Sequence, residues 1–274
     1  MSTGTYTNTV ENDAMAQSGL YLVATPIGNL EDISYRAVRI LTEADLIAAE
    51  DTRHSRTLLT HYGIDTPLMS LHEHNEIQVL DRVVELVSAG KTVALISDAG
   101  TPVISDPGYK LVCALREAGL PLFTVPGASA ITAALSVAGL PPDRFAFEGF
   151  LPAKPTARKK KLEELRDETR TLVFFESSHR ISAAITDMVE ILGETRQVAV
   201  CRELTKKFET VLRAPLLEIV QTLGEDPNQT RGEFVILIEG QVRSEDEALL
   251  GALQLATGLL EYLPASQASR AAAK

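Results

Sequence analysis

The chain has 274 residues, 45% of them hydrophobic, which is enough for two compact domains or one large one. Its formal net charge of −11 excludes uniform attraction to nucleic acid, so an RNA or DNA partner has to meet a local basic face. The charge is uneven: residues 1–150 carry 9 Lys and Arg against 18 Asp and Glu, whereas residues 151–213 carry 13 against 10. Any basic surface is therefore expected in the second half.

The ends and the cysteines predict a cytoplasmic protein. No apolar run approaches the roughly 20 residues that a membrane span needs. Residues 1–18 are polar, lack the basic start and apolar core of an export signal, and are expected to form a disordered tail. Cys113 and Cys201 lie in apolar runs and are expected to be buried thiols in a reducing compartment.

The first half predicts an α/β unit. Short apolar strands are expected at 20–24, 46–49, 67–71, 92–96 and 121–125, with helices at 35–43, 77–89, 109–117 and 131–137. Such apolar runs are typical of buried parallel strands. An open sheet of this kind binds ligands at the carboxyl ends of its strands.

Three loops at these strand ends have the same character. They span 25–30, 97–108 and 126–130, and each combines Pro and Gly with small side chains. Gly100 and Gly108 permit positive φ and close backbone approach, and the prolines stiffen the loops. Each loop alone is also compatible with an ordinary strand-to-helix turn. Together the three loops predict a pocket for a flat or extended small molecule, lined largely by backbone.

Charged residues gather after the second and third strands. Glu50-Asp51-Thr52-Arg53-His54 follows one strand and is also compatible with a solvated helix start, where acidic residues are favoured by the helix dipole. His72-Glu73-His74 follows the other, but it has no helical His-Glu-x-x-His spacing and no cysteine partners. No metal site is therefore expected.

The second half predicts a second, smaller sheet after a linker at 139–143. Strands are expected at 144–150, 171–175, 197–201, 208–213 and 232–238, and helices at 160–168, 181–192 and 216–223. Some of the connections are short, which favours mixed pairing. Residues 152–161 are expected to form a basic, proline-bearing loop that enters the helix at 160. The expected domains are a tail at 1–18, α/β units at 19–139 and 140–240, and a helical extension at 241–274.

The motifs themselves leave the chemistry open. No nucleophile elbow, Walker loop or Gly-x-Gly-x-x-Gly fingerprint is present. Several side chains at strand ends have the chemistry for proton transfer, but their spacing alone does not show whether they come together. They are Glu50, Asp51, His54, His72, Glu176 and His179.

Six motifs between residues 20 and 240 resemble the tetrapyrrole-methylase superfamily. Within it, their order resembles the ribosomal RNA branch, the 16S rRNA (cytidine) 2′-O-methyltransferases. In the first loop, tetrapyrrole-acting members typically carry a Gly-Pro-Gly type sequence, and its absence here favours RNA as the substrate. The motifs are Val-Ala-Thr25-Pro-Ile-Gly-Asn-Leu30, Ala-Glu50-Asp-Thr-Arg53, Ile-Ser97-Asp-Ala-Gly-Thr-Pro102, Val-Pro126-Gly-Ala-Ser129, Phe-Phe-Glu176-Ser-x-His-Arg180 and Cys-Arg202-Glu-Leu-Thr-Lys206.

The resemblance implies two α/β domains of the tetrapyrrole-methylase type with a donor-binding cleft between them, usually in a homodimer. The donor implied is S-adenosylmethionine, and the substrate is a cytidine of 16S rRNA in the small (30S) ribosomal subunit. Carried over by position, the residues implied near the donor are Pro26, Asp98, Ala99, Gly100, Thr101, Pro102, Ser129, Ala130, Glu176, Ser177, Leu204 and Gly232.

Methylating a ribose 2′-OH requires help, because a protonated hydroxyl is a poor nucleophile. We hypothesise that Glu50, Asp51 or Glu203 accepts or orients this proton. Candidate phosphate ligands are Arg53, Arg202 and Lys206, and the run Arg158, Lys159, Lys160 and Lys161 is a candidate for steering RNA over a longer range.

With no Trp and 5% aromatic residues, base stacking has to rely on few side chains, such as Phe150 or Tyr109. Two alternatives to the rRNA enzyme stay open: a uroporphyrinogen-type methyltransferase, and a donor-binding assembly module without turnover.

Overall fold

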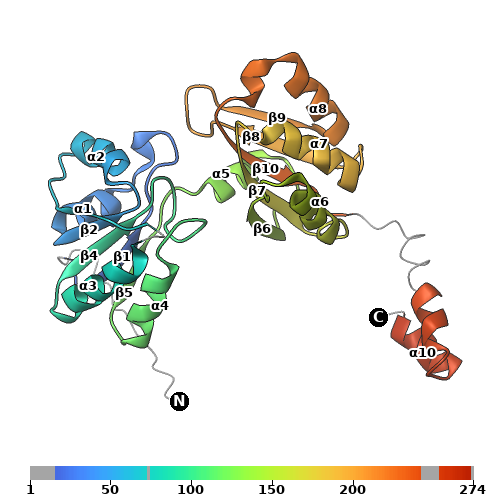
Figure 1. The fold of residues 1–274 in the computed structure, drawn as a ribbon, viewed down its shortest axis with the longest axis horizontal. Helices are drawn as coiled ribbons and strands as arrows, with labels where there is room; N and C mark the ends of the chain where they lie inside the picture. Colours follow the sequence, from blue (N-terminus) through green and yellow to red (C-terminus); the bar gives the residue numbers. More distant parts are fainter. Residues whose placement is uncertain (1–15, 73–74, 242–252, 273–274) are drawn as a thin grey trace.

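The computed structural model describes residues 16–72, 75–241 and 253–272. They form two five-stranded sheets with flanking helices and a C-terminal helical segment that includes α10 (Ala265–Ala272) (Figure 1). Most of the expected tail at 1–18 and part of the expected extension at 241–274 lie outside the described residues. Ala16, at the edge of that tail, packs against the first core, and its N–H donates to Glu43 Oε2 at 2.9 Å.

The first sheet is entirely parallel, as predicted. Its strands are β1 (Gly19–Val23), β2 (Leu46–Ala49), β3 (Leu68–Ser70), β4 (Thr92–Ile96) and β5 (Leu122–Val125), in the order β3-β2-β4-β1-β5. Because β1 and β4 are neighbours, the loops that follow them start side by side at one edge of the sheet.

Helices cover both faces of this sheet, which explains why β2 and β4 are buried at every residue. One face packs against α1 (Tyr35–Glu43) and α2 (Thr52–His61), and a short 3-10 helix, η1 (Leu30–Asp32), precedes α1. The other face packs against α3 (Glu76–Ser88) and α4 (Tyr109–Glu117).

The second sheet has mixed pairing, as predicted from its short connections. Its strands are β6 (Phe145–Phe150), β7 (Thr171–Ser177), β8 (Gln197–Arg202), β9 (Thr210–Pro215) and β10 (Glu233–Ile238). The order is β6-β7-β10-β8-β9, in which β6 and β7 are parallel and the other neighbours are antiparallel.

One face of the second sheet packs against α6 (Pro155–Glu164), α7 (Ile181–Leu192) and α8 (Leu216–Glu225), and η2 (Pro227–Thr230) follows α8. The other face packs against α5 (Ala130–Val137), which follows the last strand of the first sheet. Figure 1 shows α5 beside β10, at the junction of the two halves. Ile131 and Ala134 of α5 therefore complete the core of the second sheet.

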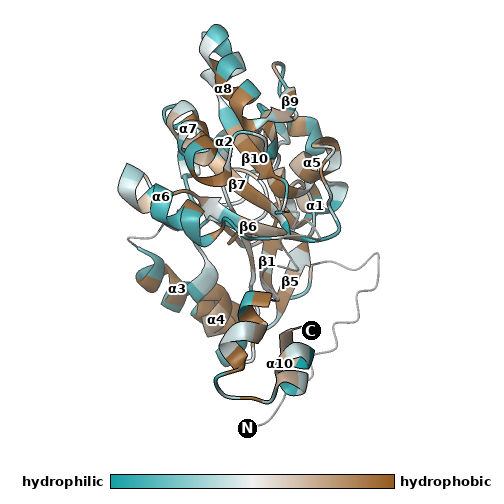
Figure 2. Cartoon of the chain, turned by 90° about the vertical axis from the view of Figure 1, so that its right-hand side faces the viewer, coloured by the Kyte–Doolittle hydropathy of each residue, from teal (hydrophilic) through white to brown (hydrophobic). Residues whose placement is uncertain are grey.

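The basic run of the second half lies in a helix and not in a loop. α6 begins at Pro155 and ends at Glu164, whereas the sequence predicted a loop up to residue 160 and a helix over 160–168. Proline is favoured in the first helical turn, because its missing N–H would have no partner there. Figure 2 shows α6 as mostly hydrophilic, whereas β7 and β10 are mostly hydrophobic.

No helix in the described parts of the chain combines the length and apolarity that crossing a membrane requires.

Candidate functional site

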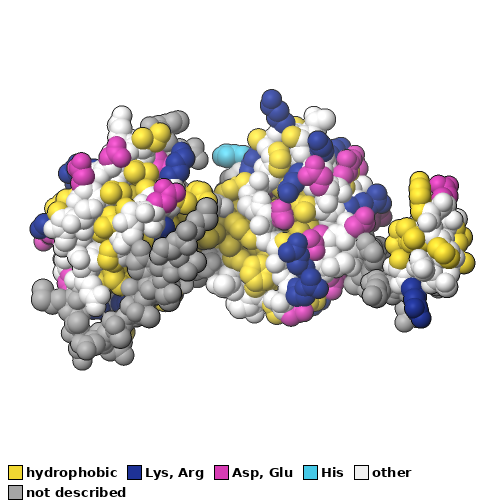
Figure 3. Space-filling model, turned by 90° about the horizontal axis from the view of Figure 1, so that it is seen from below, with side chains coloured by type: hydrophobic (Ala, Val, Ile, Leu, Met, Phe, Trp, Pro, Cys, Tyr) yellow, Lys and Arg dark blue, Asp and Glu magenta, His cyan; other side chains and the backbone are white. Residues whose placement is uncertain are grey.

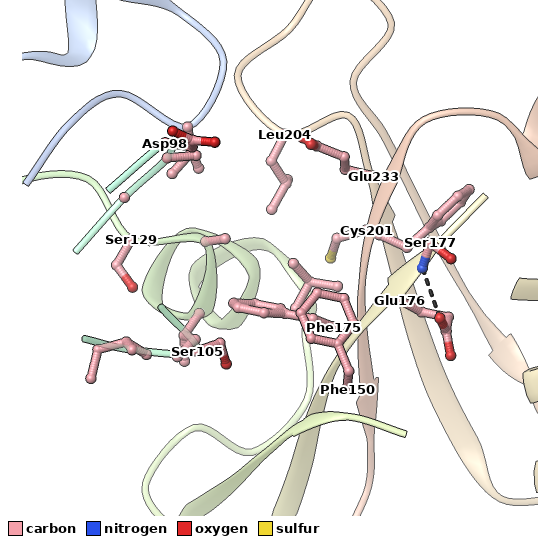
Figure 4. Close-up of a pocket in the computed structure, with 18 of the residues that line it drawn as sticks. Asp98, Ser105, Ser129, Phe150, Phe175, Glu176, Ser177, Cys201, Leu204 and Glu233 are labelled. Carbon is pink, nitrogen blue, oxygen red and sulfur yellow. Dashed lines mark hydrogen bonds between the residues drawn. The ribbon is translucent and has the colours of Figure 1, made fainter. Parts of the chain in front are cut away.

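A cavity of about 470 Å³ lies between the two sheets, within the size range of small-molecule sites (Figure 4). Its walls come from the loops after β1, β2, β4 and β5 on one side and from β6, β7, β8 and β10 on the other. Several residues singled out in the sequence line it: Glu50, Asp98, Ala99, Gly100, Thr101, Ser129, Ala130, Glu176, Ser177, Leu204, Lys206 and Gly232.

Other residues singled out in the sequence do not line this cavity: Pro26, Asp51, Arg53, Pro102, Arg158, Lys159, Lys160, Lys161, Arg202 and Glu203. The lining also includes residues that the sequence did not assign to the donor or to catalysis, among them Ser105, Asp106, Phe150, Phe175 and Cys201. Ser105 and Asp106 could have been predicted from the sequence, because they share a loop with Asp98. The aromatic residues could not, because they come together only through strand pairing.

The loops after β1 and β4 are joined by backbone hydrogen bonds. Thr25 N–H donates to the Gly100 carbonyl at 2.9 Å, and Gly100 N–H donates to the Thr25 carbonyl at 3.1 Å. Gly100 has φ +82°, which favours glycine at this close approach. Val103 and Ser105 also have positive φ, at 75° and 66°, a strained backbone of the kind that concentrates at ligand sites.

The two acidic residues after β2 have different tasks. Asp51 caps α2, because its Oδ1 accepts hydrogen bonds from Arg53 N–H at 2.8 Å and His54 N–H at 3.4 Å. The first of these bonds is the main cause that lowers the pKa of Asp51. Its own N–H donates to Asp98 Oδ1 at 3.1 Å, which ties the start of α2 to the β4 loop. Glu50 lines the cavity.

The β4 loop contributes two more carboxylates to the cavity, Asp98 and Asp106. Burial raises the pKa of Asp106, a hydrogen bond with Ser97 opposes the rise, and the negative charge of Asp98 adds to it. Asp106 therefore holds a proton more readily than an ordinary aspartate does.

The opposite wall is apolar around the end of β8. Cys201 is fully buried, and burial raises the pKa of its thiol to about 12. The thiol is therefore protonated at neutral pH and acts as an apolar part of the wall beside Leu204. Cys113 is only partly buried, so the expectation of two buried thiols is confirmed for Cys201 alone.

Glu203 holds the turn that follows β8. Its Oε1 accepts hydrogen bonds from Glu233 N–H at 3.0 Å and from Lys206 Nζ at 3.1 Å. Burial by itself raises the pKa of Glu203, but these two hydrogen bonds and the positive charges of Lys206 and Arg202 together outweigh it, so the pKa is lowered. A Cβ at Gly232 would come within 2.5 Å of Glu203 Oε1, so only glycine fits beside the carboxylate. Glu203 is an ionised structural link in this turn.

The cations of α6 are largely paired with acids. Arg158 is 3% exposed, and its Nε lies 2.6 Å from Asp187 Oδ2. Lys159 pairs with Glu190 at 2.6 Å and Lys161 with Glu148 at 2.8 Å. Figure 3 shows basic and acidic side chains next to one another over this half of the molecule. Of the four cations, Lys160 is exposed, Lys159 and Lys161 are partly buried and Arg158 is buried.

Two loops from different halves of the chain meet beside the cavity. Asn29 N–H donates to Thr205 Oγ1 at 3.1 Å. A Cβ at Gly28 would lie 2.5 Å from Lys206 Cγ and 2.9 Å from Thr205 Oγ1. Gly28 is therefore required for the loops 25–30 and 204–206 to touch.

We expect Gly28→Ala to lower the free energy of unfolding by about 1–3 kcal/mol, the usual cost of overpacking. The forced separation of the loops should also weaken binding of the donor that the sequence motifs imply. Urea unfolding and calorimetric titration with S-adenosylhomocysteine measure the two effects. Gly224→Ala in α8 is the matched control, because its Cβ would meet nothing within 4 Å. Unchanged stability and donor affinity in Gly28→Ala would show that the loops do not need this contact.

Within the described residues, no group of three or more His, Cys, Asp and Glu side chains is arranged to hold a metal ion. Glu73 and His74, of the cluster considered in the sequence, lie outside the described residues.

Comparisons with known proteins agree with this architecture. Residues 19–220 match the family "Tetrapyrrole (Corrin/Porphyrin) Methylases". A curated protein of Xylella fastidiosa named "Ribosomal RNA small subunit methyltransferase I" is 51% identical over 255 residues, covering 93% of each chain. A protein of the same name from Pseudomonas aeruginosa is 48% identical over 262 residues, 95% of this chain and 93% of that one.

Solved structures of similar fold are more distant in sequence. The uroporphyrin-III-C-methyltransferase of Thermus thermophilus superposes with a TM-score of 0.58 at 23% identity, covering 86% of this chain and 98% of that one. A cobalt precorrin-4 methyltransferase gives 0.60 at 17% identity, covering 80% and 94%. These two likenesses concern the fold alone. The family match and the close relatives together show that the chain belongs to the tetrapyrrole methylase family and, within it, to the group of ribosomal RNA small subunit methyltransferases I.

Proposed function

We propose that this chain transfers the methyl group of S-adenosylmethionine to the ribose 2′-OH of a cytidine in 16S rRNA. The observation that carries the proposal is the convergence of all six sequence motifs around one cavity or its rim, in a chain about half identical to rRNA methyltransferases. We further propose a cytoplasmic homodimer that acts on 16S rRNA or on the 30S subunit.

The cavity suits a donor with an amino-acid end and a nucleoside end. Small residues and backbone from the loop Asp98–Pro102, with Pro26 beside it, would face one side of the donor, and Leu204 and Gly232 the other. Ser129 precedes α5 at the N-cap position, but its side chain makes no capping hydrogen bond, so the first N–H groups of this helix are available to the donor carboxylate. Ala130, Glu176 and Ser177 complete the proposed surroundings.

Transfer forms a bond between the ribose O2′ and the donor methyl carbon while the carbon–sulfur bond breaks, and the hydroxyl proton has to leave O2′. We assign its acceptance to Glu50, the one of three candidate carboxylates that lines the cavity. Asp51 is used as the α2 cap and Glu203 as the β8 turn link, which supports positioning roles for both. Asp106, which also lines the cavity and has a raised pKa, is the alternative candidate for the base.

The RNA backbone is proposed to meet exposed cations beside the cavity. Arg53 projects from α2 with its side chain 93% exposed and forms a long ion pair with Asp51, at 3.6 Å, and Lys160 is exposed on α6. Lys159, Lys161, Arg202 and Lys206 are proposed as weaker contributors, because each already bonds to groups of the protein. Arg158 is left out of the RNA face, since its burial keeps phosphate away.

The test is transfer of labelled methyl from S-adenosylmethionine to 30S subunits that lack the modification, to naked 16S rRNA and to a porphyrinogen. Label at a cytidine 2′-O position is the expected result. Label in the porphyrinogen alone would make the chain a tetrapyrrole methyltransferase instead. Donor binding without transfer to any of the three would favour a non-catalytic assembly role.

A further inference from the structure

One aromatic ring in the wall of the cavity is left largely uncovered. Phe150 is the last residue of β6, lines the cavity and is 54% exposed. A ring in this situation offers a flat apolar face to a planar ligand. Tyr109, the other aromatic residue considered in the sequence, is 68% exposed but does not line the cavity.

The backbone of β6 turns this ring towards the cavity side of the sheet. The pairing of β6 with β7 shifts register between Phe147 and Gly149, and Gly149 has φ +67°. In a regular strand, residues three apart point to opposite faces. The extra residue of a bulge brings them to the same face. Phe147 and Phe150 accordingly both contact Phe175 edge to face, with ring centroids 4.8 and 5.6 Å away.

An ion pair between the partly exposed Arg180 and the buried Glu176 lies beside the ring. The guanidinium carbon of Arg180 lies 6.0 Å from the Phe150 ring centroid, and Arg180 Nη1 donates to the Leu151 carbonyl at 3.2 Å. Arg180 is itself held by Glu176 Oε1, which lies 2.8 Å from Nε and 2.7 Å from Nη2. Glu176 is 3% exposed. Both the backbone and the ring at the end of β6 are therefore held in place before any ligand arrives.

We propose that Phe150 stacks on the base of the acceptor cytidine, with Arg180 and Glu176 as its positioning residues. This inference rests on the proposed function and names how that site holds its substrate. In Figure 4, Phe150 lies at the opposite end of the cavity from Asp98 and Leu204, two of the residues assigned to the donor, whereas Glu176, which is also placed near the donor, lies close to Phe150. The half-exposed ring is thus reached from solvent, as an unstacked base of an RNA strand would reach it.

The β4 loop lies beside this end of β6. A Cβ at Gly149 would be 3.7 Å from Ser105 Oγ, and both Ser105 and Phe150 line the cavity. In the proposal, a base stacked on Phe150 therefore lies next to the β4 loop of the first half of the molecule.

The test compares Phe150→Ala, Phe150→Trp and Tyr109→Ala in methyl transfer to 30S subunits and 16S rRNA. Phe150→Ala should lower kcat/KM for RNA by about 10- to 100-fold, the range for loss of one stacked base. This change should come mainly through KM, with unchanged affinity for S-adenosylhomocysteine by calorimetry. Phe150→Trp should restore transfer, and Tyr109→Ala should behave as wild type.

The tryptophan variant adds a direct readout, because the chain has no other Trp. Its emission in the S-adenosylhomocysteine complex should be quenched by naked 16S rRNA, provided that this RNA is a substrate of the wild type. Arg180→Lys and Glu176→Gln should raise KM for RNA more than they lower kcat, as expected of residues that position a binding surface.

Two results would overturn the stacking role: wild-type kinetics in Phe150→Ala, or a parallel loss of donor affinity, which would assign the ring to the donor adenine. Failure of Phe150→Trp to restore transfer would also count against it. If the wild-type chain methylates no RNA, the proposed function itself is wrong. If the wild type methylates RNA and Phe150→Ala does so equally well, only the stacking role is wrong.

Discussion

Glu50→Gln is expected to slow methyl transfer by about 100-fold or more, the usual effect of removing a positioned general base. The amide keeps the size of the carboxylate but does not accept the hydroxyl proton. Donor affinity should hardly change, because the assigned role concerns the acceptor O2′ and not the donor. Single-turnover transfer to the RNA substrate, with calorimetry for the donor, separates the two quantities.

Two further variants sharpen the assignment of Glu50. Asp51→Asn weakens the cap of α2 and should affect stability more than the chemical step, because its carboxylate is bonded to backbone N–H groups. Asp106→Asn tests the cavity carboxylate whose pKa is raised. If Asp106→Asn abolishes transfer and Glu50→Gln does not, the proton goes to Asp106 and the assignment of Glu50 is wrong.

Arg158→Met should lower the free energy of unfolding by about 3–5 kcal/mol, because it leaves a buried carboxylate without its main partner. Asp187 keeps only Lys159 Nζ, at 3.7 Å, in place of the 2.6 Å contact with Arg158. Pairing the change with Asp187→Leu should recover most of the loss, since an apolar pair of similar volume replaces the ion pair. Chemical denaturation of the single and double variants measures this coupling.

Lys160→Met is the matched control on the same helix. It removes an exposed charge, so the free energy of unfolding should stay near that of the wild type. The slope of the logarithm of the RNA-binding constant against the logarithm of salt concentration should become shallower by about one. If Arg158→Met is as stable as the wild type and its RNA binding depends less steeply on salt concentration, Arg158 contacts RNA and its assigned structural role is wrong.

Much of the fold follows from local patterns. α1 and α4 begin and end at the residues that their apolar spacing predicted. The parallel first sheet follows from fully apolar strands separated by helices. The predicted range of the helix at α6 was wrong because Pro155 was assigned to a loop, although proline also suits a first helical turn.

The convergence of the strand-end loops was predictable, since parallel strands end at one edge of a sheet. The structural roles of the charged residues could not be predicted, because their bonding partners are distant in the sequence. Arg158 and Asp187 are 29 residues apart, and Glu203 bonds to the backbone of Glu233, 30 residues away. Phe150 became a cavity residue through a bulge that its sequence pattern does not reveal.

The position of α5 determines where the two halves of this fold can be recombined with those of a homologous protein. The helix follows the last strand of the first sheet in the chain, but its apolar residues belong to the core of the second. A chimera joined in the linker after α5 would set that helix against a foreign sheet and leave mismatched apolar surfaces in contact. Moving the crossover ahead of Ala130 keeps the helix with the sheet it packs on, so recombination should succeed there and fail ten residues further along.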